Sequence, residues 1–363
     1  MPPHLPTVLT LDAGGTNFVF SAIRDFKQII EPVTLPAEPN DLKKCIATII
    51  HGFDQISEKV SPVDAISFAF PGPANYELGI IENLPNFKAF NGSVPLGPIL
   101  QNRFEVPVYI NNDGDLFASG VARVVLPELN SRLRTAGSKK QFYNLIGLTL
   151  GTGFGCGIVI NGQLLTGDNS NAAGIHNTLN YSNSKWNAEE SVSTRAIQRV
   201  YAERAGLPFD ARLMPKEIYQ IAKGHKEGNV GAALQAFFEY GKGLGNSISN
   251  ILTLVDGLVV LGGGLSASWD LFSPFMFNEI NRKYENFKGE NMDRLSVKVF
   301  NLEDPTVFNQ FAQGEIKQVA ISGTDKTIEY DAMPRTGIAL SKIDASLMTS
   351  LGAYAFVLQK SDK

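Results

Sequence analysis

Cysteine, histidine and excess positive charge are scarce in this sequence of 363 residues, and each scarcity excludes a class of protein. Two cysteines, Cys45 and Cys156, cannot form a disulfide framework, and there is no C-x-x-C pair to hold zinc. The four histidines show no metal-binding spacing. A formal net charge of -4, without a cluster of Lys and Arg, argues against a protein that binds nucleic acid by neutralising phosphates.

Long apolar segments are also missing. The longest nearly apolar segment, Leu145 to Ile160, is shorter than the roughly 18 residues that a membrane-spanning helix needs, and five glycines interrupt it. The first residues, Met1 to Pro6, lack the basic and apolar regions of a secretory signal. We therefore expect a cytoplasmic protein, and its length predicts about two domains at roughly 150 residues each.

Glycine, by contrast, is abundant, with 34 copies that gather in clusters. A β-rich segment, Val8 to Leu11, leads into the turn Asp12-Ala13-Gly14-Gly15-Thr16-Asn17, and a second apolar segment follows. The same design recurs around Gly151-Thr152-Gly153-Phe154-Gly155, and the two stretches align without a gap from Thr10 and Thr149. This repetition predicts a duplicated domain in which each half opens with a β-hairpin.

Helical and strand periodicities alternate along the rest of the chain, which predicts an α/β fold. The expected helices cover 41–60, 116–125, 190–204, 230–254 and 347–359, and the expected strands cover 65–70, 106–110 and 258–261. We expect a surface loop over 126–142 and a β-hairpin insertion around 306–344. The insertion could be decoration, a lid or a dimer contact. The predicted domains are 1–125, rejoined by the terminal helix 347–363, and 126–346.

Both glycine turns are candidate phosphate sites, because adjacent glycines let backbone N–H groups approach an anion closely. In the first turn Thr16 adds a hydroxyl donor, and the Asp12 carboxylate has the chemistry to order a hydrated Mg²⁺ ion. The second turn offers Thr152 and Gly153. A hairpin without any ligand is the alternative for each turn taken alone.

Two further segments lie where α/β proteins bind ligands, between the end of a strand and the start of a helix. At Asn112-Asp113 a carboxylate could take a proton from a hydroxyl nucleophile. An Asx turn that caps the helix is the alternative, and Asp115 competes for either role. Gly262-Gly263-Gly264 would admit a phosphate or a flat ligand close to the backbone, or would serve tight packing.

Six segments, in this order, resemble the motifs of the ROK family (repressors, open reading frames, kinases). The family's sugar kinases have the two-domain actin-like, ribonuclease H-like ATPase fold with a central cleft. The resemblance covers nearly the whole chain, and the matching segments are Leu9–Thr16, Phe70–Pro73 with Asn83–Phe87, Val106–Asp113, Gly151–Gly162, Val259–Gly264 and Ser350–Ala353.

The resemblance implies ATP- and Mg²⁺-dependent phosphoryl transfer to a hexose hydroxyl, with glucose as the first candidate. It makes Asp113 the general base, places Asn112 and Gly72 on the sugar side, and lets Asp12 organise Mg²⁺ through water. Phosphate binding would fall to Gly14, Gly15, Thr16, Thr152 and Gly153, and adenosine binding to Gly262 and Gly263. A homodimer is implied too, with no nucleic-acid or membrane partner.

One part of the family pattern is missing. Members usually carry E-x-G-H and then a C-x-C-G-x-x-G-C zinc loop, whereas this sequence has Asn171–Asn177 and no cysteine up to Glu189. Either His176 or Asn177 would replace the sugar-binding His, and Glu189, with Glu190 as runner-up, would match the later sugar-binding Glu. We expect no zinc, a loop held by the aromatic residues Tyr181 and Trp186, and an altered sugar pocket.

Other functions stay open. The sugar could be fructose, an N-acetylhexosamine, mannose or allose, and the chain could bind a sugar without turnover. A ROK sensor or repressor is a further alternative. Such repressors carry an N-terminal helix-turn-helix domain, which we do not expect here because the first hairpin begins at Val8.

Overall fold

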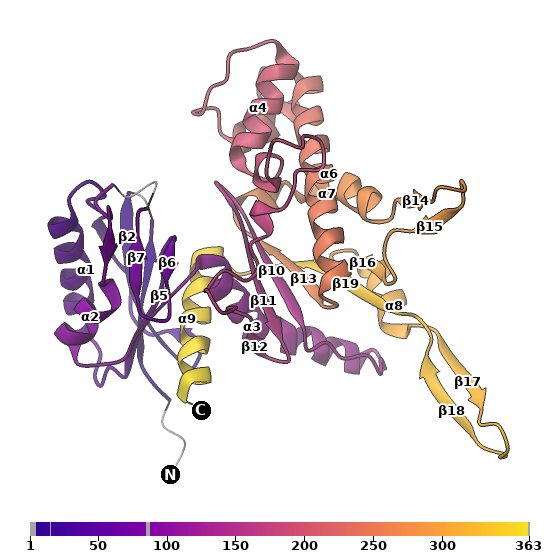
Figure 1. Cartoon of the computed structure of the whole chain (residues 1–363), viewed down its shortest axis with the longest axis horizontal. Coiled ribbons are helices and arrows are strands. Elements are labelled where there is room, and N and C mark those ends of the chain that lie inside the picture. Colours follow the sequence, from indigo (N-terminus) through magenta and orange to yellow (C-terminus); the bar gives the residue numbers. More distant parts are fainter. Residues whose placement is uncertain (1–4, 15, 85–87, 362–363) are drawn as a thin grey trace. The chain divides into compact units, whose positions relative to one another are not determined.

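The computed structural model describes residues 5–14, 16–84 and 88–361, and the chain forms two compact units (Figure 1). Unit 1 comprises Met1–Val125, Gly157–Ala173 and Ile343–Lys363, and unit 2 comprises Leu126–Cys156 and Gly174–Lys342. Residues 157–173 and 343–346, which were expected in the second domain, group with unit 1.

Unit 1 is built on a mixed sheet with the strand order β3-β2-β1-β5-β9, in which β4 also pairs with β2. The hairpin expected at the first glycine turn is present, since Val8 pairs with Ile23 and Ala13 with Phe18. The neighbours β1, β5 and β9 run parallel. The strands are β1 Val8–Ala13, β2 Asn17–Arg24, β3 Lys27–Gln28, β4 Val33–Pro36, β5 Ala65–Ala69 and β9 Val108–Asn111.

Helices cover both faces of this sheet (Figure 1). Alternate strand residues point to opposite faces, so Leu9 joins the core under α1 and α2, whereas Val8 packs against Leu351 and Tyr354 of α9. The helices and the small accessory sheet of this unit are α1 Leu42–Ser57, α2 Leu96–Phe104, the part of α3 Asp113–Thr135 that precedes Leu126, α9 Ala345–Ser361, β6 Ala74–Asn75, β7 Ile80–Glu82 and β8 Ser93–Val94.

Within unit 1, α3 and α9 cross at two glycines. A Cβ atom on Gly352 would lie 1.7 Å from the carbonyl oxygen of Leu116, and one on Gly120 would lie 2.3 Å from that of Met348. No side chain larger than hydrogen fits at this crossing. The Leu-Gly-Ala segment near the C-terminus is therefore a helix-packing element.

The loop expected over 126–142 is wrong in its first half, because α3 continues to Thr135 with Pro127 inside it. Leu126, Leu129 and Leu133 are all buried and recur on one face of the helix. That apolar stripe outweighs the polar composition of the segment.

Unit 2 holds most of the second sheet, whose order is β12-β11-β10-β13-β19-β16. β10 and β11 flank the second glycine turn, as expected, and β13 pairs in parallel with both β10 and β19. The strands are β10 Leu145–Leu150, β11 Phe154–Ile160, β12 Gln163–Leu164, β13 Leu258–Gly262, β16 Lys298–Asn301 and β19 Arg335–Leu340.

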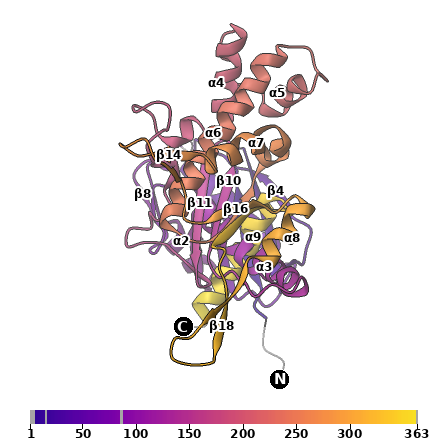
Figure 2. The same cartoon turned by 90° about the vertical axis from the view of Figure 1, so that its right-hand side faces the viewer.

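The helices α4, α5 and α6 gather at one end of unit 2 (Figure 2), and α6 also packs along α7. The helices of this unit are α4 Thr194–Ala205, α5 Pro215–Ala222, α6 Val230–Leu254, α7 Trp269–Ile280 and α8 Pro305–Gln313, with short 3-10 turns η1 Ile175–Asn177, η2 Ala188–Glu190 and η3 Gly264–Ser268. No helix in the described ranges has the length and apolar character to cross a membrane.

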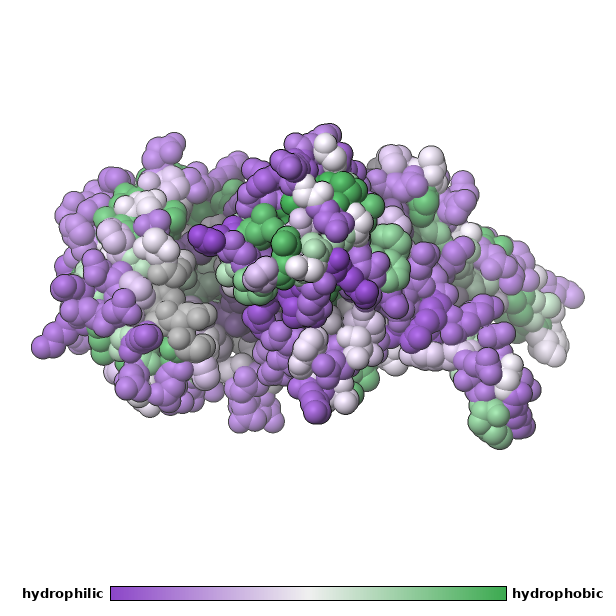
Figure 3. Space-filling model, turned by 90° about the horizontal axis from the view of Figure 1, so that it is seen from above, coloured by the Kyte–Doolittle hydropathy of each residue, from purple (hydrophilic) through white to green (hydrophobic). Residues whose placement is uncertain are grey.

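Two hairpins complete unit 2: β14 Lys283–Glu285 with β15 Asn291–Asp293, and β17 Ile316–Ala320 with β18 Thr327–Asp331. The second is the hairpin expected within 306–344, but it is shorter than that segment. Residues 305–313 form α8, and 335–340 form β19 inside the main sheet. Hydrophilic residues cover most of the face in Figure 3, where apolar residues form small patches.

Candidate functional site

The parallel strands of unit 1 end at one edge of the sheet, and polar residues gather there. Asp12 is in register with Ala69, and Ala69 with Asn111. Asn112 and Asp113 directly follow β9, and Gly72 follows β5. The carboxyl edge of an α/β sheet is where ligands bind. The structure thus brings the residues predicted for the sugar, the base and the metal to one edge of unit 1.

Asn112 and Asp113 are held by the start of α3. The Oδ1 atoms of both side chains accept a hydrogen bond from the Gly114 N–H, each at 2.9 Å. Asp113 is exposed and is the first residue of α3. The capping contact offered as an alternative is therefore present, and it fixes the carboxylate at the site edge.

Asp115, the competing carboxyl, is buried with 7% of its surface exposed. Burial, reinforced by the negative charge of Asp113, raises the pKa of Asp115 to about 7. Because an inaccessible carboxyl cannot reach a substrate hydroxyl, Asp113 is the one of the two that can act as a base.

Tyr76 is a site residue that the sequence analysis missed. Its hydroxyl donates to the Phe70 carbonyl oxygen at 2.9 Å and is hydrogen-bonded to the Asn112 side chain. A Cβ atom on Gly72 would lie 3.1 Å from this hydroxyl. Burial raises the pKa of Tyr76, so the hydroxyl keeps its proton at neutral pH. Tyr76 thus connects the segment after β5 with Asn112.

At the first glycine turn, the Asp12 Oδ2 atom accepts a hydrogen bond from the Ser346 hydroxyl at 2.5 Å. Ser346 lies 334 residues away at the start of α9, so no local sequence signal could have pointed to it. The Thr16 side chain is exposed at the turn, and Gly14 is half-buried. Gly15 lies outside the described residues, as do Pro85, Asn86 and Phe87 of the sugar-side segment.

Glu189 holds the second glycine turn in unit 2. Its Oε2 atom accepts a hydrogen bond from the Phe154 N–H at 2.9 Å, and its Oε1 atom accepts one from Arg195 at 2.8 Å. Arg195 also donates to Glu190 at 2.7 Å. Glu189, predicted as a sugar ligand, thus contacts the second glycine turn directly, and Arg195 was missed because nothing in its local sequence marks it.

The tip of the second glycine turn is exposed to solvent. The Gly151 N–H donates to the Gly153 carbonyl at 3.1 Å, and the Gly151 carbonyl accepts from the Thr194 N–H at 2.8 Å. Thr152, between the two glycines, is exposed. Its hydroxyl is therefore presented at the place where a phosphate was expected.

Gly262 and Gly263 end β13 beside the second turn. Gly262 is in register with Thr149, and Gly263 has a φ of +91°. A Cβ atom on Gly263 would lie 2.4 Å from the Leu150 carbonyl oxygen. The packing role offered as an alternative for these glycines is thus present at Gly263.

The segment that replaces the zinc loop is organised by Asn180. The Asn180 Nδ2 atom donates to the Asn187 carbonyl at 2.9 Å and to the Ser191 hydroxyl at 2.8 Å. The aromatic contacts expected of this loop are present, since Arg199 lies over the Trp186 ring at 4.5 Å and the Tyr181 hydroxyl donates to Glu239 at 2.7 Å.

Of the candidates for the sugar-binding His, His176 is half-buried in η1 and Asn177 is exposed. Cys45 and Cys156 are buried, and neither is in a disulfide bond within the described ranges. Within the part of the chain that the structure describes, no group of three or more His, Cys, Asp or Glu residues is placed to hold a metal ion.

Comparison with known proteins gives three main findings. The model of the ROK family matches residues 8–301. The crystal structure of a glucokinase from Parabacteroides distasonis is 47% identical, covers 98% of both chains and has a TM-score of 0.87. An N-acetyl-D-glucosamine kinase from Haemophilus influenzae is 27% identical over 277 residues, which are 70% of this chain and 83% of that protein.

A xylose repressor from Caldicellulosiruptor bescii is also similar, with 26% identity over 67% of this chain and 60% of the repressor. The structural match extends over nearly the whole length, so the predicted α/β fold of the actin-like ATPase type is confirmed. These similar proteins thus include both enzymes that phosphorylate sugars and a repressor.

Proposed function

The chain belongs to the ROK family, and we propose that it is an ATP- and Mg²⁺-dependent sugar kinase that phosphorylates a hexose hydroxyl, with glucose as its substrate. The observation that carries this proposal is the accessible Asp113 carboxylate, fixed at the same sheet edge as Asn112, Gly72 and Asp12. A protein that only binds a sugar needs no carboxylate positioned to accept a proton.

In the proposed reaction, the sugar lies on the unit 1 edge, with its hydroxyl beside Asp113. The Asp113 carboxylate takes the hydroxyl proton as the sugar oxygen attacks the γ-phosphorus of ATP, and the bond from that phosphorus to the β-phosphate oxygen breaks. Sugar phosphate and ADP leave, and the proton passes from Asp113 to solvent. Asn112, held by Tyr76, orients the sugar.

The glycine turns are the candidate phosphate-binding segments. Gly14, Gly15 and Thr16 belong to the first turn and Thr152 and Gly153 to the second, and Gly262 and Gly263 are the candidates for adenosine binding. Of the sugar-side candidates in unit 2, His176 stays a candidate sugar ligand, whereas Glu189 supports the second glycine turn by accepting the Phe154 N–H.

Asp12 fits a role in Mg²⁺ binding. Mg²⁺ prefers oxygen ligands and usually keeps several waters beside one or two carboxylates and the substrate phosphates. The Asp12 carboxylate is half-buried, and the Ser346 hydroxyl orients it. When bound, Mg²⁺ would neutralise charge on the phosphates.

The glucose assignment is supported by the 47% identity to a glucokinase. An N-acetylhexosamine is the alternative substrate, because a relative at 27% identity is an N-acetyl-D-glucosamine kinase. A regulatory, sugar-binding role is the alternative to catalysis, since a xylose repressor is similar over 67% of this chain. The homodimer stays a prediction.

The test is an ADP-release assay with MgATP and a panel of hexoses, on chelator-treated enzyme. We expect turnover on glucose that requires Mg²⁺ but no added zinc. Asp113→Asn should lower kcat by about 100-fold or more, since positioned bases contribute roughly 10²–10⁴-fold. No turnover on any sugar, or a near-normal rate for Asp113→Asn, would overturn the proposal.

A further inference from the structure

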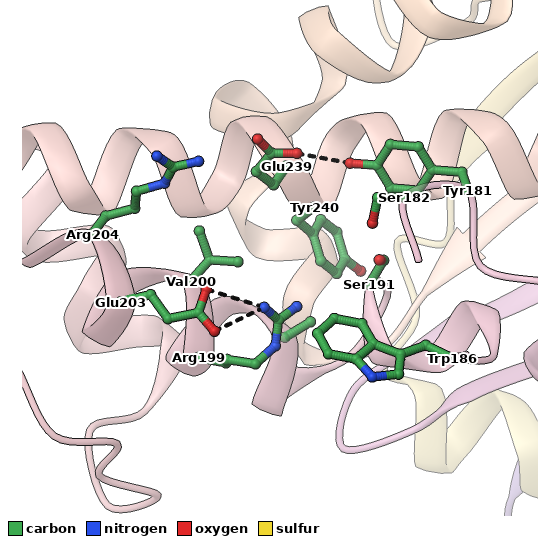
Figure 4. A pocket seen from close by; sticks show the side chains of 11 residues that line it. Tyr181, Ser182, Trp186, Ser191, Arg199, Val200, Glu203, Arg204, Glu239 and Tyr240 are labelled. Carbon is green, nitrogen blue, oxygen red and sulfur yellow. Dashed lines mark hydrogen bonds and ion pairs between the residues drawn. The ribbon is translucent and has the colours of Figure 1, made fainter. Parts of the chain in front are cut away.

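A cavity of about 220 Å³ lies in unit 2, between the loop 181–191 and the helices α4 and α6 (Figure 4). The loop contributes Tyr181 and Trp186 to its wall, α4 contributes Arg199 and Glu203, and α6 contributes Glu239 and Tyr240. None of these residues belongs to the sugar or nucleotide contacts assigned above. The cavity is therefore a separate feature that the proposed reaction does not use.

The charges in the wall cancel. Arg199 pairs with Glu203 at 3.2 Å and lies over the Trp186 ring, and Glu239 accepts the Tyr181 hydroxyl (Figure 4). The one other cation of the wall, Arg204, is exposed. With two arginines and two glutamates, the wall has no net charge to favour an ion. The ligand that fits such a wall is neutral and rich in hydrogen-bonding groups.

The Tyr240 hydroxyl lacks a hydrogen-bond partner among the described residues, although only 1% of this residue is exposed. Burial raises the pKa of Tyr240, so the hydroxyl stays protonated. A buried hydroxyl without a partner costs free energy, and a ligand hydroxyl in the cavity would supply the partner. Ser182 and Ser191 add two more hydroxyl groups to the wall.

We propose that this cavity binds one neutral monosaccharide, at a site distinct from the sugar site on the edge of unit 1. A volume of about 220 Å³ corresponds to roughly seven water molecules at about 30 Å³ each, which suits a single sugar ring. Carboxylate and guanidinium groups beside aromatic rings match the alternating hydroxyl and C–H surfaces of a sugar.

Binding in the cavity would act on the second glycine turn. Arg199 donates to the Glu190 carbonyl oxygen at 3.2 Å, and the neighbouring Glu189 holds the Phe154 N–H. Ser191, in the cavity wall, is bonded to Asn180, which organises the loop. A sugar in contact with these groups would restrain the segment that supports the turn, so the site is regulatory in character.

The two tryptophans of the chain allow a direct test, because Trp186 lines the cavity and Trp269 does not. In a Trp269→Phe background, Trp186 is the sole tryptophan, and its fluorescence can be titrated with glucose, mannose and N-acetylglucosamine. Adding Asn112→Ala weakens the sugar site of unit 1. We expect at least one of these sugars to change the fluorescence saturably in both backgrounds.

Tyr240→Phe should weaken this response about fivefold, the effect of one lost hydrogen bond. It should leave the melting temperature unchanged or higher, since the hydroxyl has no partner to lose among the described residues. Tyr143→Phe, which alters a tyrosine that is 64% exposed outside the cavity, is the matched control and should change nothing.

The proposal is overturned if no neutral sugar of the panel changes the fluorescence, or if Tyr240→Phe binds as the parent does. Tighter binding of glucose 6-phosphate than of glucose would also overturn it, because the ligand would then be an anion. The kinase assay on the wild-type chain is read separately. Loss of turnover for every sugar, with the Trp186 response intact, would refute the kinase and leave the cavity site standing.

Discussion

Replacing Glu189 tests whether this residue supports the second glycine turn or binds the sugar. Glu189→Ala leaves the Phe154 N–H without its acceptor, and Phe154 is only 1% exposed. A buried donor without a partner costs about 1–3 kcal/mol. Glu189→Gln keeps an acceptor for the N–H and loses only the ion pair with Arg195. In that pair the Glu189 side chain is 21% exposed and the Arg195 side chain 43%. That pair contributes at most about 1 kcal/mol.

The assay combines thermal unfolding with steady-state kinetics. In a domain of this size, 1 kcal/mol shifts the melting temperature by about 2–4 °C. Glu189→Ala should therefore lower the melting temperature of unit 2 by several degrees. It should also raise the KM for ATP, because the turn proposed to bind phosphate loses its support. Glu189→Gln should show a smaller loss of both kinds. Glu315→Gln, which removes an exposed ion pair with Lys317, is the control and should change neither quantity.

The reasoning would be refuted by the opposite pattern of effects. If Glu189→Ala left the melting temperature and the KM for ATP unchanged but raised the KM for the sugar, Glu189 would be a sugar ligand. The contact with the Phe154 N–H would then contribute no support to the turn.

Three further predictions concern unit 1. Burial raises the pKa of Asp115 from 3.8 to about 7, so ionisation of this carboxyl opposes folding. The free energy of unfolding should therefore fall by up to about 4 kcal/mol as the pH rises from about 4 to about 7. Urea denaturation of Asp115→Asn should show no such dependence on pH. Gly352→Ala places a Cβ 1.7 Å from the Leu116 carbonyl and should cost about 1–3 kcal/mol or more in thermal unfolding. Tyr76→Phe removes the hydroxyl bonded to Asn112 and should raise the KM for the sugar about fivefold without changing that for ATP.

Each of these predictions has an outcome that contradicts it. An unchanged pH slope in Asp115→Asn would mean that this carboxyl is ionised in the folded protein. Gly231→Ala, near the start of α6, meets only the Asn229 side chain at 3.5 Å and is the control for the helix crossing; an equal loss in both alanine variants would refute the crossing argument. A Tyr76→Phe enzyme that lost kcat instead of sugar affinity would show that the hydroxyl acts in the chemical step.

Local sequence patterns predicted the layout of the fold and several residues of the candidate site. Local patterns carry this information, because a β-rich segment, a glycine turn and a second β-rich segment specify a hairpin wherever they occur. Asp12, Asn112 and Asp113 could be located because Asp12 lies next to the end of β1 and the other two directly follow β9, and the carboxyl ends of parallel strands meet at one edge. The family motifs in their order identified the ROK fold, and the missing cysteines excluded the usual zinc loop.

Contacts between residues distant in the chain could be identified only from the folded structure. Ser346 reaches Asp12 across 334 residues, and Glu189 reaches the Phe154 N–H across 35. No local pattern encodes such pairs, because they depend on how helices and loops pack after the strands have formed. Burial likewise separated Asp113 from Asp115, two carboxyls that look equivalent in sequence, since the helix turns one toward solvent and the other into the core.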